Sequence, residues 1–456
     1  MTGNCNRWLV YFAAAYLALQ ATNFGTFWRS ATFIGAVLLA ACAWREQQSR
    51  PDGRITSPGL IVLIPLVVWL TWSSLTWFWS VNPAYSRQEL KAEVLDTALM
   101  MGTFYIAARS TASFRLIMSA VIGSFAFFTA LACILSLLPW GWNPDRFHHG
   151  IGPFSTYLVL MAPLLLLLAP APIGFRRDGR SLVAGAILLV LLLASAKLTN
   201  NRIVWIALFT VLAVAAIGGC WRWPRALVRT GWRWVLPLAL VVLVLVLAFL
   251  SAVVERNEIN YAGISSVQEA LAEDPRLALW SSTFEKIRAR PWQGYGFGRK
   301  ILAAELTREL HDPLLTHAHN IFVSQWLQVG AVGLLAFVSL LAGIAWRMLT
   351  FLRSRDDALA LVGLIGLSLL AGMVVKNLTD DFMFDSNGRA FWCLMAVLLG
   401  YGSSKSRHDT EVPWPSTRQK SGGSATTNPS PTIATAAPTP GSSMAVHRSR
   451  RLHRRT

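Results

Sequence analysis

The stretch that decides the fold is Thr316–Leu334, with the sequence THAHNIFVSQWLQVGAVGL. Two histidines and an asparagine stand there directly before a long apolar segment. Because about 20 apolar residues are enough to cross a bilayer, this segment predicts a membrane-spanning helix. Titratable side chains at such a boundary are costly to keep, which makes His317 and His319 candidate functional residues.

The composition of the chain excludes a soluble protein. Of its 456 residues, 54% are hydrophobic and only 14% are charged, and the mean hydropathy is +0.46. Apolar stretches of roughly membrane-crossing length recur at residues 8–24, 27–44, 58–79, 92–108, 115–138, 154–170, 181–196, 203–220, 234–253, 319–346, 357–376 and 389–403. We therefore expect an all-α polytopic membrane protein with about twelve transmembrane helices.

The basic residues of the short loops predict the orientation. Alternate loops carry arginine clusters, at residues 45–54, 109–115, 176–180, 222–233 and 347–355. Arginine-rich loops remain in the cytoplasm, so we expect this set and both termini on the cytoplasmic side. Residues 254–318 then form one large loop on the opposite face. The first span has no clear small-residue cleavage site, so we expect it to be retained and not removed as a signal peptide.

The chain is expected to divide after residue 403. Residues 1–403 form the transmembrane domain, whereas residues 404–456 are rich in Ser, Thr, Pro and Gly and end in a basic run. Such a segment buries too little apolar surface to fold, so we expect a disordered basic cytoplasmic tail that contacts membrane lipids. The net charge of +18 thus reflects mainly topology, and no nucleic-acid partner is expected. The five cysteines are scattered in or beside apolar spans, which argues against a disulfide framework.

The large loop has predicted structure of its own. Asp274 and Pro275 predict a helix start, as an N-cap followed by proline at the first helical position. Apolar residues then recur at helical spacing and predict one buried stripe, made of Leu277, Trp280, Phe284 and Ile287. Pro291 ends the pattern. The glycines of residues 294–298 follow and predict a flexible turn near the membrane surface, as a hinge or as a close backbone approach.

Two cationic sites on the outer side are candidates for anion binding. Arg276 lies in the first turn of the predicted loop helix, where the helix dipole adds to its charge. Arg202, with Lys197, lies in a very short outer turn between two spans. A guanidinium fork matches phosphate oxygens well, so these residues suit a lipid-linked diphosphate. The alternative is that each arginine caps a helix or extends to lipid headgroups.

Together these segments resemble the O-antigen ligase and polymerase superfamily of bacterial membrane glycosyltransferases. The motifs that carry the resemblance are His319-Asn320 with Gln325, Leu327-Gln328 and Gly330-x-x-Gly333-Leu334, the run Pro291–Gly298, Arg276-x-x-x-Trp280, Asn201–Trp205, and more weakly Trp79–Pro83 and Gly150–Ser155. The resemblance extends over roughly residues 60–400 and is most specific in 195–335. The chain departs from the family at Asn201, where serine is common, and at Val329, where glutamate is common.

The resemblance implies a GT-C-like fold of about twelve helices in the bacterial inner membrane, with a large periplasmic loop. It implies a glycan donor carried on undecaprenyl diphosphate and, for the ligases, an acceptor hydroxyl on the lipid A core. His319 is then the expected general base of a metal-independent inverting displacement that needs no cofactor. Arg202, Arg276 and Lys197 would stabilise the leaving diphosphate. The residues expected to position the substrates are His317, which is also the reserve base, Asn320 and Asp381.

Several alternatives remain open from the residues. An O-antigen polymerase or a protein O-oligosaccharyltransferase would use the same donor site, and a transporter of lipid-linked sugars is a different class. A metal site at His317-x-His319 would need further ligands from other loops. Asp380, Asp381 and Asp385 could bind acceptor sugars, orient a catalytic group or cap helices. His148 and His149 could bind sugar or be a solvated pair.

Overall fold

The computed structural model describes residues 4–23, 25–49, 56–139, 141–169, 179–224, 239–252, 275–313, 315–379 and 381–411. These residues form helices and loops, with no strand among them. The helices of the first half are α1 (Asn4–Leu19), α2 (Thr26–Gln48), α3 (Leu60–Leu75), η1 (Thr76–Trp79), α4 (Pro83–Glu89), η2 (Leu90–Leu95), α5 (Asp96–Ala107), α6 (Thr111–Ser136), α7 (Pro144–His148), α8 (Ile151–Met161), η3 (Ala162–Leu168), α9 (Gly179–Leu198) and α10 (Arg202–Arg222). A further apolar helix covers Ala239–Ala252. The helices of the second half are α13 (Pro275–Ala289), α14 (Ala303–Leu310), α15 (Ile321–Leu352), α16 (Asp357–Lys376) and α17 (Asp385–Glu411).

Every predicted span coincides with a helix in the part of the chain that the structure describes. Eight of these helices are long and apolar enough to cross a membrane, namely Thr26–Gln48, Leu60–Trp79, Thr111–Ser136, Ile151–Leu168, Gly179–Leu198, Arg202–Arg222, Ile321–Leu352 and Asp357–Lys376. The chain is therefore an all-helical multi-pass membrane protein. That the other four predicted spans also cross stays a prediction.

The loops gather into two groups that follow the predicted alternation. Among the loops rich in arginine, Arg222 pairs with Asp357 at 3.0 Å and Arg109 donates to Gln47 at 2.5 Å. The other loops also contact one another. The backbone N–H of Asn23 donates to Phe147, and that of Val81 donates to Tyr295, each at 3.0 Å. The described parts of the arginine-rich loops thus meet at one end of the bundle. The described parts of the other loops meet at the opposite end, which we call the outer end after the predicted orientation.

The last helix continues beyond the boundary expected at residue 403. α17 runs to Glu411, and Lys405 pairs with Asp356 at 3.0 Å, so this extension is tied to the start of α16. The compact unit of the chain likewise ends at Glu411. The predicted tail from residue 412 onward lies outside the described residues.

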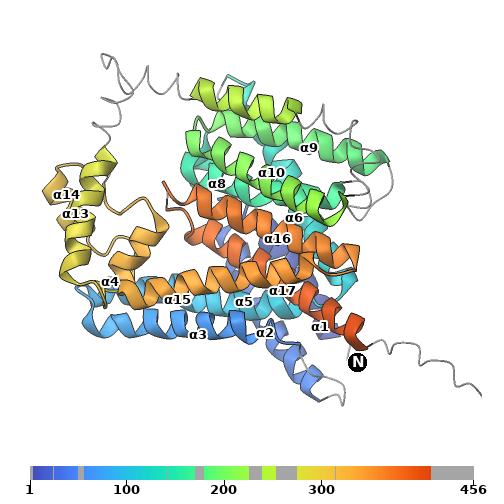
Figure 1. Cartoon of the computed structure of the whole chain (residues 1–456), viewed down its shortest axis with the longest axis horizontal. Coiled ribbons are helices and arrows are strands. Elements are labelled where there is room, and N and C mark those ends of the chain that lie inside the picture. The colour runs from blue at the N-terminus through green and yellow to red at the C-terminus, as the bar shows by residue number, and fades with distance from the viewer. Residues whose placement is uncertain are drawn as a thin grey trace, which may run out of the picture. The chain divides into compact units, whose positions relative to one another are not determined.

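The long helices pack in pairs within this unit. α15 packs along α3 and along α16, α16 packs along α10, and α5 packs along α17. The short helices α13 and α14 lie together at the end of the bundle where α15 begins (Figure 1). They enclose a small core of their own, which includes Leu279, Ile287 and Leu306. The described part of the large loop, from residue 275 onward, is therefore a folded cap.

The loop helix α13 begins at the predicted proline and ends before Pro291, as expected, but its buried face differs from the prediction. Leu277 and Phe284 are 50% and 38% exposed. Ile287 is buried as predicted and Trp280 packs against the small core, but the fully buried positions before Ile287 are Leu279 and Thr283. Both sets have helical spacing, and the sequence alone favoured the larger apolar side chains. Contact with α14 selects the other face.

The glycine run of residues 294–298 makes a close backbone approach and is not a free hinge. It lies against a kink in α15, where Gly330 has φ 67° and ψ −176°. A Cβ on Gly330 would collide with the backbone of Trp292, and one on Gly294 would collide with the backbone of Gln328. Only glycine at both positions lets the two backbone segments touch. A side chain there would be strained by the positive φ and would also collide with the other segment.

The kink leaves helix carbonyls without their usual partners, and the glycine run supplies the missing donors. Tyr295 N–H donates to Leu327 at 3.0 Å and Gly296 N–H donates to Gln328 at 3.0 Å. The indole of Trp72, on α3, donates to the carbonyl of Val329 at 2.7 Å. Since an unpaired carbonyl at membrane depth costs several kcal/mol, these bonds stabilise the kink.

Replacing Gly330 with alanine is expected to destabilise the protein. The added Cβ is strained at φ 67° and meets the backbone of Trp292. The expected loss of unfolding free energy is about 1–3 kcal/mol. Thermal unfolding of the purified protein in detergent measures it as a lowered midpoint.

The matched control is Gly123→Ala in α6, where an added Cβ meets no heavy atom within 4 Å. This change should leave the midpoint unaltered or raise it slightly, since alanine favours a helix by about 0.5–1 kcal/mol over glycine. Equal unfolding midpoints for Gly330→Ala and the wild type would show that the kink does not require glycine at residue 330.

Candidate active site

The two histidines lie in the loop between α14 and α15, at the outer end of the bundle. Their ring centroids are 3.9 Å apart. The loop is held from one side by Trp280 of α13, whose indole donates to the carbonyl of Ala318 at 2.8 Å. His319 has φ 51°, a conformation that non-glycine residues rarely adopt. Such strain often occurs at functional sites, where the surroundings hold it in place.

The two histidines differ in their surroundings. His317 is 7% exposed, its Nδ1 lies 3.2 Å from the Thr316 hydroxyl, and its Nε2 is buried without a hydrogen-bond partner. Burial, and then the charge of Arg299, lowers the pKa of His317 to about 2. His317 is therefore neutral and weakly basic at neutral pH. His319 is only half-buried and is the more accessible of the two.

Asn320 serves as the N-cap of α15. Its side-chain oxygen accepts from the N–H groups of Phe322 and Val323 at 3.0 and 3.2 Å, and its Nδ2 donates to the carbonyl of Leu378 at 2.9 Å. The next residue, Ile321, donates its N–H to the carbonyl of Asn377 at 3.0 Å. The start of α15 is thus tied to the end of α16, which fixes the position of the histidine loop.

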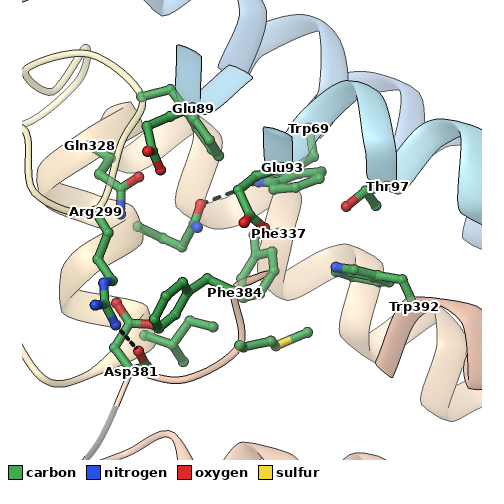
Figure 2. Close-up of a pocket in the computed structure, with 14 residues that line it drawn as sticks. Trp69, Glu89, Glu93, Thr97, Arg299, Gln328, Phe337, Asp381, Phe384 and Trp392 are labelled. Carbon is green, nitrogen blue, oxygen red and sulfur yellow. Dashed lines mark hydrogen bonds between the residues drawn. The ribbon is translucent and has the colours of Figure 1, made fainter. Parts of the chain in front are cut away.

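A small polar pocket of about 50 Å³ lies beside this loop. Figure 2 shows it between the acidic residues of α4 and η2, the start of α15 and the segment before α17. Its lining residues are Trp69, Glu89, Glu93, Thr97, Phe297, Arg299, Ile321, Gln325, Gln328, Phe337, Asp381, Met383, Phe384 and Trp392. The pocket thus combines charged side chains, two amides and several aromatic rings.

Arg299 is the cation of this pocket and follows the glycine run directly. Its guanidinium carbon lies 3.5 Å from the ring centroid of Phe384. Its Nη1 donates to the backbone carbonyl of Asp381 (Figure 2). Gln328 accepts from the N–H of Gly298 at 2.9 Å, which fixes the backbone immediately before the arginine. Arg299 therefore links the large loop to the segment that precedes α17.

Two carboxylates face the same pocket from one continuous helical stretch. Glu89 ends α4, and Glu93 lies in η2, a π-helical turn. Glu93 Oε1 accepts from the N–H of Asp385 at 2.9 Å. Burial raises the pKa of Glu89, and the charge of Arg299 opposes the rise. π-Turns inside helices are frequent at functional sites.

Arg276 lies on the first turn of α13, as predicted, although Asp274 is outside the described residues. It stands one turn before Trp280, the residue that contacts the histidine loop, so both share a face of the helix. The structure therefore brings this arginine to the same cap as His319. Arg276 takes part in contacts of its own.

Lys197 and Arg202 flank the short turn between α9 and α10. The Nζ of Lys197 donates to Ser251 at 3.1 Å. Asn201 caps α10 by accepting from Ile203 N–H at 3.1 Å, which places Arg202 at the first helical position. α10 packs along α16, and the residue after α16, Asn377, accepts a hydrogen bond from the start of α15. Lys197 and Arg202 therefore lie at the outer end of the bundle. α16 stands between this pair and the histidine loop.

Asp381 is buried, at 5% exposure, and lines the pocket of Arg299. Asp380 lies outside the described residues. Asp385 has φ 49° and pairs with Arg389 at 3.3 Å. The described residues contain no group of three or more His, Cys, Asp or Glu side chains that could hold a metal ion.

Sequence reasoning missed Arg299, Glu89 and Glu93. Glu93 offered a signal, because an acidic residue inside a predicted span is a functional candidate by default. Arg299 offered none, since its burial depends on α4 and on the segment before α17, both far away in the sequence. The pocket is therefore a tertiary feature.

Replacing Arg299 with glutamine is expected to destabilise the fold in a pH-dependent way. The variant leaves Glu89 and Glu93 facing the pocket without their cation. The expected loss of unfolding free energy near neutral pH is about 1–3 kcal/mol. A carboxyl with a raised pKa destabilises the fold only where it is ionised, so the loss should shrink as the pH falls through that pKa.

The neighbouring Lys300→Gln provides a matched control because this side chain is exposed. Thermal unfolding from pH 8 to about pH 4 compares both variants with the wild type. A pH-independent loss in Arg299→Gln, or the same loss in Lys300→Gln, would contradict a charge role for Arg299 in the pocket.

Comparison with known protein families gives one match, over residues 187–338, to the family described as O-antigen ligase. The matched segment contains Lys197, Arg202, Arg276 and both histidines of the loop. The pocket residues Glu89, Glu93 and Asp381 lie outside it. No curated protein matches the chain.

Proposed function

Because residues 187–338 place the chain in the O-antigen ligase/polymerase superfamily, we propose that it is an O-antigen ligase. It transfers a polysaccharide from undecaprenyl diphosphate to a sugar hydroxyl of the lipid A core. The observation that carries the proposal is the anchored histidine pair at the mouth of α15, inside the matched segment, with His319 held at positive φ. The lipid-linked polysaccharide and the lipid acceptor are its substrates.

In the proposed reaction the acceptor hydroxyl oxygen attacks the anomeric carbon of the donor sugar. The bond from that carbon to the diphosphate oxygen breaks as the new glycosidic bond forms, so the configuration inverts. His319 takes the hydroxyl proton as general base, and no metal or cofactor enters the step. The depressed pKa of His317 makes it a poor base. This supports His319 as the base and His317 as the residue that positions its ring.

The leaving diphosphate gains negative charge, which Arg202, Arg276 and Lys197 would stabilise. Arg276 is supported by its place on α13, one turn from the contact with the histidine loop. Arg202 is supported by its place at the N-terminus of α10, where free N–H groups add to its charge. Asn320 acts by fixing the position of the histidine loop, and Asp381 acts by fixing the position of Arg299.

The proposed location is the bacterial inner membrane, with both termini in the cytoplasm. The described parts of the arginine-rich loops lie at one end of the bundle and the histidine loop lies at the other. Since arginine-rich loops stay cytoplasmic, the active site would face the periplasm. A lipid-linked glycan presents its diphosphate at that surface.

Replacing His319 with alanine is expected to abolish most transfer. Loss of a general base lowers the rate by about 10²–10⁴-fold. The assay follows long-chain lipopolysaccharide formed by the purified protein from undecaprenyl-linked polysaccharide and lipid A core. Transfer at the wild-type rate by a folded His319→Ala protein would refute the general-base role.

The matched control is His311→Ala, an exposed histidine at the end of α14 in the same cap. It should transfer as the wild type does. In cells, loss of capped lipid A with accumulation of already polymerised donor identifies a ligase. Accumulation of single repeat units would instead identify a polymerase, and loss of glycosylated protein would identify a protein O-oligosaccharyltransferase.

A further inference from the structure

A second and larger cavity lies beside the pocket of Arg299, at the same end of the bundle. Its volume is about 270 Å³. Its lining residues are Asp145, His149, Pro153, Phe382, Phe384, Asp385, Ser386 and Asn387. Phe384 borders both cavities. The second cavity therefore adjoins the candidate active site through one aromatic ring.

The two walls of this cavity come from segments far apart in the sequence and are tied together. Asn387 Nδ2, at the start of α17, donates to the carbonyl of Pro153 in α8 at 3.0 Å. Phe382 packs so closely on Gly152 that a Cβ there would collide with its ring. The carboxylate of Glu93 accepts a hydrogen bond from the backbone N–H of Asp385 at 2.9 Å. Contacts between distant segments of the chain thus form the cavity and fix its walls.

The charges of the lining disfavour an anion. Two carboxylates, Asp145 and Asp385, line the cavity, Arg389 pairs with Asp385 at 3.3 Å, and the described lining residues include no lysine or arginine. His149 faces Arg29, which lies 3.4 Å from its Nε2, and also Arg389 and Asp385. Burial first, and then the charges of Arg29 and Arg389, lower the pKa of His149. The lowered pKa favours the neutral imidazole, and because its Nε2 accepts from Arg29, its other ring nitrogen carries the N–H that can donate to a hydroxyl group.

The aromatic residues and the size of the cavity fit a sugar ring. Phe382 and Phe384 have ring centroids 6.2 Å apart and planes inclined by 25°. Such rings offer flat apolar faces to the C–H side of a pyranose, while carboxylates and amides serve its hydroxyls. Small-molecule pockets begin at about 300 Å³, so this cavity suits one ring and not a polymer.

We propose that the cavity of His149, Phe384 and Asp385 is the subsite for one uncharged pyranose ring of the acceptor glycan. The inference rests on the proposed transferase function. The acceptor is favoured over the donor because the donor ring carries a diphosphate, and no cation is among the described residues that line the cavity. The sugar hydroxyls donate to the carboxylates and accept from the ring N–H of His149, and Phe384 orients the ring toward the adjacent histidine loop.

Two substitutions test the subsite without disturbing the backbone. His149→Asn keeps a residue that tolerates its φ of 56°. Phe382→Leu removes an aromatic face that lines this cavity but not the pocket of Arg299, and it keeps an apolar side chain. Each should raise the acceptor KM by about tenfold, which corresponds to about 1.4 kcal/mol. The donor KM and kcat should stay near the wild-type values. An unchanged acceptor KM, or a parallel rise in the donor KM, overturns the proposal.

The matched controls are His311→Asn, at φ 54° on the exposed end of α14, and Phe78→Leu, whose ring is 74% exposed. Neither residue lines the cavity, so both variants should keep the wild-type acceptor KM. A rise in acceptor KM in the controls equal to that in the test variants also overturns the proposal. Thermal unfolding confirms that each compared protein is folded.

A direct binding measurement separates this inference from the proposed function. Core oligosaccharide released from lipid A and dephosphorylated is titrated into the full-length protein in detergent. Binding that is lost in His149→Asn, and that weakens when the oligosaccharide keeps its phosphates, supports the subsite even if transfer fails. Absence of binding to the wild type overturns the subsite even if transfer succeeds.

Discussion

The structure of the outer end depends on how the broken hydrogen bonds of α15 are replaced. At Gly330 the helix loses the regular partners of three successive carbonyls, and no water at membrane depth can take their place. The N–H groups of residues 295–296 and the indole of Trp72 supply those bonds. α3, α15 and the large loop are thereby joined into one unit. The position of Arg299, which directly follows the glycine run, depends on that junction.

Local patterns in the sequence predicted much of this molecule. Apolar runs gave the helices, the Asp-Pro pair gave the start of α13, and the alternating glycines allowed a close backbone approach. The polar pair at the mouth of α15 indicated where a site would lie. What the sequence did not reveal depends on contacts between distant segments. Packing against α14 determines which face of α13 is buried. Packing against the ring of Phe384 covers the guanidinium of Arg299.

The outer end contains two electrostatic environments. The matched segment contributes the cations at residues 197, 202 and 276 together with the histidine pair. The cavity of His149 and Asp385 comes from segments outside that match and carries carboxylates and a neutral imidazole. In the proposed reaction the first environment suits the anionic leaving group and the second suits an uncharged nucleophile. Phe384 borders both this cavity and the pocket of Arg299, so one aromatic ring separates those two cavities.

The π-turn at Leu90–Leu95 has a consequence for how this helix can vary. A π-turn holds one residue more than an α-turn of the same kind, so residues before it are rotated relative to those after it. Glu89 can therefore face the pocket while α5 keeps its own apolar face against α17. Loss of one residue within the turn would rotate one part of the helix against the other by about 100°. The orientation of these acids is thus a matter of chain length as much as of residue type.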